Sequence, residues 1–171
     1  MNKIILNQLT HFNRVNIPKY IESKIQSTAL IHLELSDMGK LRDRMEGQSY
    51  YNKLRTDIVA EFAFENIIGI RSFDWEKRNH KGFKRKKYFF ENKQLNLIAF
   101  ENESLPKISI DHVENCVFIY VSVDRVFMSN LATKSYLNQI SKKQKSSIID
   151  ITEFQDLIEF TSLDELISKM E

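Results

Sequence analysis

Residues 116–123 read CVFIYVSV and form the most apolar stretch of the chain. β-Branched and aromatic side chains dominate this stretch, which is typical of a strand covered on both faces of a sheet. The stretch therefore predicts a central strand. Residues 125–129 predict a further strand directly after it.

The sequence before this strand predicts the rest of a sheet. Residues 86–91 and 94–100 have strand-like composition and are separated by a tight turn at Asn92 and Lys93, so they predict a hairpin. Residues 70–75 predict an earlier strand. Pro106 interrupts the pattern after the hairpin, as expected between strands.

Helical patterns flank the predicted sheet. Residues 18–35 carry apolar side chains at three- and four-residue intervals, and Pro18 suits a first helical turn. Residues 49–68 predict a longer helix, with Ser49 as its N-cap and Gly69 just after its end. Residues 133–140 predict another helix, and residues 150–171 an acidic amphipathic one.

Together these elements predict an α+β (mixed α/β) fold, in which N-terminal helices precede a central mixed sheet of about five strands flanked by helices. We expect one core domain over residues 1–149, with a helical part at 1–68 and a sheet part at 69–140. Residues 150–171 would follow it as a separate C-terminal helix.

Composition narrows the class of protein but not its function. The chain has 171 residues, of which 42% are hydrophobic and 28% charged, which suits one globular domain. It has no long apolar window, so we expect no membrane partner. Its one cysteine, Cys116, cannot form an internal disulfide, and a cytoplasmic location is expected.

The formal charge of +2 hides two opposed segments. Residues 71–93 carry nine cations and three acids, whereas residues 150–171 carry seven acids and one lysine. A basic run beside aromatic residues attracts nucleic-acid phosphates, although it can also be a solvated hairpin edge. The predicted nucleic-acid-binding residues are Lys77, Arg78, Lys81, Lys84, Arg85, Lys86 and Lys87.

The predicted helix 49–68 carries a line of carboxylates on an otherwise apolar surface. Asp57, Glu61 and Glu65 are four residues apart, so they share one face of the helix. Lys53, Arg55 or the nearby basic run can neutralise them, or Glu61 can have a functional role. The four histidines lack zinc-ligand spacing, and no P-loop, G-x-S-x-G or G-x-G-x-x-G motif is present.

The order of elements over residues 49–140 resembles the restriction-endonuclease-like, or PD-(D/E)XK nuclease, superfamily. Residues 91–93 read ENK and match the E-x-K of that family, although they fall at the predicted hairpin turn. The resemblance implies a catalytic set of Glu61, Asp74, Glu91 and Lys93. In it Asp74 and Glu91 would hold Mg²⁺, Glu61 would be an auxiliary acid, and Lys93 would lie beside the attacking water.

Three functions follow as hypotheses. The first is a DNA-binding protein of nuclease-like fold acting as a metal-dependent endonuclease in restriction or phage defence. The second is a module that binds DNA or RNA without chemistry, and the third is an interaction or inhibitory protein that uses the basic hairpin and the acidic tail. The resemblance also implies that the protein could act as a homodimer.

Overall fold

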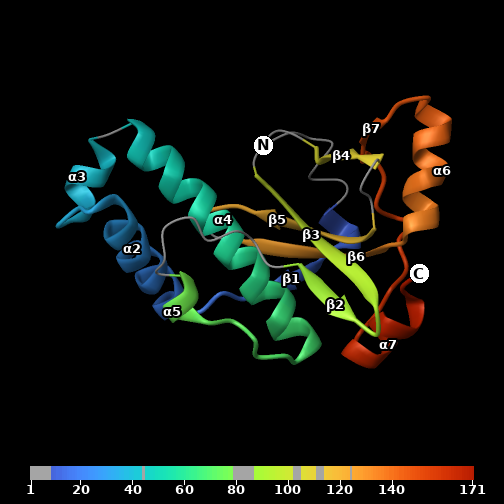
Figure 1. Ribbon diagram of the computed structural model, residues 1–171, viewed down its shortest axis with the longest axis horizontal. Helices are drawn as coiled ribbons and strands as arrows, with labels where there is room; N and C mark the ends of the chain where they lie inside the picture. Colours follow the sequence, from blue (N-terminus) through green and yellow to red (C-terminus); the bar gives the residue numbers. More distant parts are fainter. Residues whose placement is uncertain (1–8, 44, 79–86, 102–104, 111–113, 124) are drawn as a thin grey trace.

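The computed structural model describes residues 9–171 except 44, 79–86, 102–104, 111–113 and 124. These residues form an α+β fold around a five-stranded mixed sheet, as the sequence predicts (Figure 1). The helices are the 3₁₀ turn η1 (Leu9–His11), α2 (Lys19–Leu33), α3 (Met38–Arg42), α4 (Met45–Ile68), α5 (Trp75–Arg78), α6 (Lys134–Gln144) and α7 (Leu163–Lys169). The strands are β1 (Asn13–Val15), β2 (Tyr88–Phe90), β3 (Lys93–Glu101), β4 (Lys107–Ser109), β5 (Asn115–Val121), β6 (Val126–Ala132) and β7 (Ile148–Asp150).

The predicted central strand is β5, and the order of the sheet is β1-β6-β5-β3-β2. All its residues are buried, and it pairs in parallel with β3 and antiparallel with β6. β2 and β3 form the predicted hairpin, but its turn residues are Glu91 and Asn92, with φ of 46° and 66°. Two consecutive positive φ angles are the geometry of a type I′ turn, which matches the twist of the strands.

Alternating side chains along β5 divide the apolar core between the two faces of the sheet. Val117, Ile119 and Val121 belong to the core covered by α2 and α4. Cys116, Phe118 and Tyr120 belong to the core covered by α6 and residues 149–157. In Figure 1, α2 and α3 lie to the left of the sheet and α4 runs across its left part, whereas α6 lies to the right and β4 and β7 lie above the right part.

The long helices begin and end close to their predicted positions. α4 starts at Met45, four residues before the predicted N-cap Ser49. Gly69 follows its last residue with φ of 75°, a conformation that glycine adopts without the Cβ penalty. Thr133, where the next helix was predicted to begin, is the N-cap of α6, because its side chain accepts a hydrogen bond from the N–H of Tyr136.

The predicted strand over residues 70–75 does not form. Residues 70–74 have no regular structure, and α5 begins at Trp75. The carboxylate of Glu65 accepts the backbone N–H groups of Ser72 at 2.8 Å and Phe73 at 2.9 Å. Because a side chain satisfies these donors, the segment does not need a neighbouring strand.

The acidic segment 150–171 is helical only at α7, so the prediction of one long helix is wrong. Leu131 and Ile158 instead exchange two backbone hydrogen bonds of 2.9 Å, which tie the segment to β6. Phe154 packs against Phe12 and Phe118, with ring centroids 4.9 and 5.4 Å apart. Phe154 and Leu157 therefore belong to the core although the part of the segment before α7 is not helical. In the described parts of the chain, no helix has the length and apolar character needed to cross a membrane.

Candidate functional site

Glu61, the predicted auxiliary acid, lies inside the protein. Its side chain is 1% exposed and forms an ion pair with Arg78, whose side chain is 4% exposed. The Arg78 guanidinium also lies over the ring of Phe73, 4.8 Å from its centroid. Arg78 was predicted to contact phosphate, but a guanidinium enclosed in this way is not presented to a nucleic acid.

Glu65, one turn further along α4, is also an internal hydrogen-bond acceptor. Besides the two backbone N–H groups of Ser72 and Phe73, it accepts the hydroxyl of Ser72 and that of Tyr88 at 2.9 Å. Burial, and secondarily the Glu65 carboxylate, raise the pKa of Tyr88 above its usual range. Glu65 therefore fixes the segment between α4 and α5 and links it to β2.

Asp74 has a structural role at the start of α5. Its Oδ1 accepts the N–H groups of Glu76 at 2.9 Å and Lys77 at 3.3 Å, and its Oδ2 lies 3.5 Å from the Lys77 ammonium. The hydrogen bond from the Lys77 N–H is the main cause of a lowered Asp74 pKa. These contacts make Asp74 the cap of a short helix.

Glu91 and Lys93 lie at the β2–β3 hairpin, and Figure 1 shows its turn and α5 on opposite sides of α4. Glu91 is exposed in the turn. The Lys93 ammonium donates to the carbonyls of Ile167 at 3.2 Å and Met170 at 2.6 Å, near the C-terminal end of α7. The structure therefore does not bring together Asp74, Glu91 and Lys93.

The predicted magnesium ligands do not fit a shared ion. Asp74 and Glu91 belong to separate elements on either side of α4, and the oxygens of Asp74 are already engaged. Among the described residues there is no group of three side chains able to hold a metal.

Most of the basic run cannot be placed. Lys81, Lys84, Arg85 and Lys86 lie outside the described residues. Lys77 and Lys87 flank them and are exposed, which leaves their ammonium groups accessible to a phosphate.

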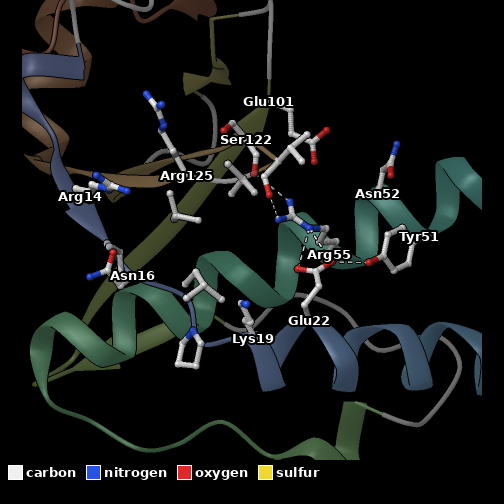
Figure 2. A pocket seen from close by; sticks show the side chains of 16 residues that line it. Arg14, Asn16, Lys19, Glu22, Tyr51, Asn52, Arg55, Glu101, Ser122 and Arg125 are labelled. Carbon is white, nitrogen blue, oxygen red and sulfur yellow. Dashed lines mark hydrogen bonds and ion pairs between the residues drawn. The ribbon is translucent and has the colours of Figure 1, made fainter.

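The structure shows a cleft of about 840 Å³ that the sequence did not predict (Figure 2). It lies where β3 and β5, which run in parallel, reach their C-terminal ends, and the start of β6, β1, the first turn of α2 and α4 complete it. Ligand sites are common at this end of parallel strands in open α/β sheets. In the described part of the chain, the charged residues that line the cleft are Arg14, Lys19, Glu22, Arg55, Glu101 and Arg125.

Arg55 and Glu22 form a fixed wall of the cleft. Arg55 Nε lies 3.0 and 3.1 Å from the two Glu22 oxygens, and its other nitrogens donate to the carbonyls of Ser122 at 3.2 Å and Val123 at 3.0 Å. The hydroxyl of Tyr51 donates to Glu22 at 2.5 Å. Burial, and then the Glu22 carboxylate, raise the pKa of Tyr51 to about 12.

The remaining charges of the cleft are mostly positive. Figure 2 shows Arg14 and Arg125 on one side of the opening and Lys19 below it. All three side chains are exposed. Those of Arg14 and Lys19 form no hydrogen bond or ion pair with another described residue. Opposite them, burial raises the pKa of Glu101, an effect that the nearby Arg55 partly offsets. The cleft is therefore suited to an anion.

Sequence reasoning missed this cleft because its cations do not form a run. Arg14 and Lys19 are five residues apart, and the distant Arg125 comes close to them only through the pairing of β1 with β6. No local charge density could have indicated them. No match to this chain was found among protein-family models, curated protein sequences or solved structures.

Proposed function

We propose that this protein binds nucleic acid through phosphate contacts in the cleft, without hydrolysing it. The observation that carries the proposal is the convergence of Arg14, Lys19 and Arg125 around one opening. Arg55 is neutralised by Glu22, so among the described residues of the cleft these three cations outweigh Glu101. Phosphate groups are the anions that such spaced cations bind along a polymer, with release of counterions.

The basic segment over residues 77–87 is a second source of positive charge in the chain. Its described ends, Lys77 and Lys87, are exposed. A polyanion can engage both regions, because phosphates repeat along its whole length. A small anion, in contrast, would occupy the cleft alone.

We also propose that the fold of this chain is related to the restriction-endonuclease-like fold. The chain has most of the elements on which the resemblance rests, namely α4, the β2–β3 hairpin, β5, β6 and α6, but it lacks the short strand expected over residues 70–75. The acids expected in an active nuclease have other partners here. Glu61 is paired with Arg78 and Asp74 caps α5, so the proposal is limited to binding.

Fluorescence anisotropy with labelled oligonucleotides tests the proposal. The double variant Arg14→Ala with Lys19→Ala should weaken binding and lower the slope of log K against log salt, by about 0.9 per lost contact for duplex DNA and about 0.7 for a single strand. The matched control, Lys142→Ala with Lys143→Ala, removes two exposed cations from α6, on the other side of the sheet. It should leave both quantities nearly unchanged.

Two results would contradict this function. Equal losses in the two double variants would show that general charge, and not the cleft, attracts the nucleic acid. Hydrolysis of plasmid DNA with Mg²⁺ that is abolished by Asp74→Ala would show that the protein is an enzyme after all.

A further inference from the structure

A second cavity, of about 550 Å³, lies beside the same turn of α2. It is formed by the start of α2, the C-terminal part of α4, the segment 69–73 and the start of α5. Lys19 lines the cleft, whereas the next residue, Tyr20, lines this second cavity. Its aromatic and polar lining includes Tyr20, Phe62, Asn66, Arg71, Phe73 and Trp75.

Aromatic side chains at this cavity are accessible and held in place. Tyr20 is 56% exposed, so its ring is available for contact with a ligand at the mouth of the cavity. Phe73 and Trp75 pack edge to face, with centroids 4.8 Å apart. The backbone N–H of Phe73 is bound by Glu65, and its ring contacts Arg78, so the segment that carries these rings is anchored to α4.

Charge decides between two kinds of ligand for an aromatic cavity. Aromatic rings bind organic cations, but they also stack on nucleobases. The Lys24 ammonium already lies 5.2 Å from the centre of the Trp75 ring, and Arg71 is exposed without an ion pair in the described part of the chain. Glu65, the one acid among the described residues that line the cavity, has its oxygens occupied by Ser72, Phe73 and Tyr88. This balance disfavours a cation and favours a flat ring attached to a phosphate.

We infer that the cavity takes an unpaired base of the bound strand, so that the protein prefers single-stranded to duplex nucleic acid. This inference rests on the proposed function. Phosphates lie on the cleft cations around Lys19, and one base turns across the first turn of α2 to stack beside Tyr20 and Trp75. A base in a duplex is already stacked and paired, so it cannot enter the cavity without being unpaired.

Trp75 provides a direct readout because it is the only tryptophan in the chain. Titration with a single-stranded oligonucleotide should quench its fluorescence, whereas the duplex of the same sequence and heparin should quench it much less. Tyr20→Leu should weaken single-strand binding roughly tenfold, in the range found for the loss of one stacked base. Tyr20→Phe keeps the ring and should bind as the wild type does.

Ile31→Ala is the matched control, since Ile31 is 55% exposed on the same helix but does not line the cavity. Equal affinity for single strand and duplex, with Trp75 unquenched and Tyr20→Leu without effect, would overturn the inference and leave the proposed function intact. Absence of binding to every oligonucleotide would overturn both. Quenching by tetramethylammonium but not by the single strand would show instead a cavity for cations.

Discussion

Breaking the ion pair between Glu61 and Arg78 should destabilise the protein strongly. Glu61→Gln keeps the shape of the side chain but leaves the buried guanidinium of Arg78 without its carboxylate. Removing one member of a buried pair typically costs about 3–5 kcal/mol of unfolding free energy. That is a large share of the roughly 5–15 kcal/mol that stabilises a typical domain.

Urea denaturation followed by circular dichroism measures this loss. With an m-value of about 2 kcal/mol/M, the midpoint should fall by roughly 1.5–2.5 M. Glu76→Gln makes the same chemical change at an exposed position of α5 and should alter stability by no more than about 0.5 kcal/mol. The double variant Glu61→Leu with Arg78→Met should recover most of the loss, because an apolar pair can replace a buried ionic one.

The structural role of Glu61 would be refuted by a midpoint for Glu61→Gln within about 0.5 M of the wild type. It would also be refuted if the double variant lost as much stability as the single variants Glu61→Leu and Arg78→Met together. The ion pair would then not be the source of the loss.

Three further predictions test other buried groups. Asn115→Ala should cost about 2–4 kcal/mol of stability in urea, because the buried amide bonds the carbonyls of Gln94 and Glu171 and the N–H of Glu171; an unchanged midpoint would contradict this. Burial raises the pKa of the Cys116 thiol to about 12, so Ellman's reagent at pH 8 should react rapidly only after unfolding, and rapid reaction of the native protein would refute the burial. Burial raises the pKa of Tyr51 to about 12, so the stability it contributes is complete below about pH 10 and is lost as pH rises toward 12; thermal melts should show a shallower alkaline decline in Tyr51→Phe, and an equal decline would count against it.

The central strand and the long helices were predictable because their signals are local. A run of β-branched and aromatic residues has few alternatives to a buried strand, and β5 follows it within one or two residues. Gly69 marks the end of α4 because its positive φ suits glycine. The strands β1, β4 and β7 have three residues each, which is too short for a period-two pattern to be read.

The candidate site was less predictable because the spacing of residues along a helix does not show which part of the protein each face contacts. The intervals of Asp57, Glu61 and Glu65 place them on one stripe, but only the tertiary structure shows that Glu61 and Glu65 point inward. A signal was available, since apolar residues occupy most of the rest of this helix. Carboxylates on a helix buried on most sides require internal partners, and Arg78 and the Ser72 and Phe73 N–H groups supply them.

These two acids connect the interior to the proposed binding surface. Glu61 holds Arg78 at the end of α5, and Glu65 holds the backbone at Ser72 and Phe73, so both ends of the segment that carries Phe73 and Trp75 are anchored to α4. Glu61, which was predicted to be an auxiliary catalytic acid, and Glu65, its neighbour in the same line of carboxylates, thus position the rings of the aromatic cavity. Glu61→Gln should therefore shift the fluorescence of Trp75 and weaken single-strand binding even below the urea concentration at which the variant unfolds. The contribution of Arg14 to nucleic-acid binding in the cleft should persist in this variant. If single-strand binding and the contribution of Arg14 were lost together, α5 and the cleft would unfold as one unit. The aromatic cavity and the cleft would then not be separate binding surfaces.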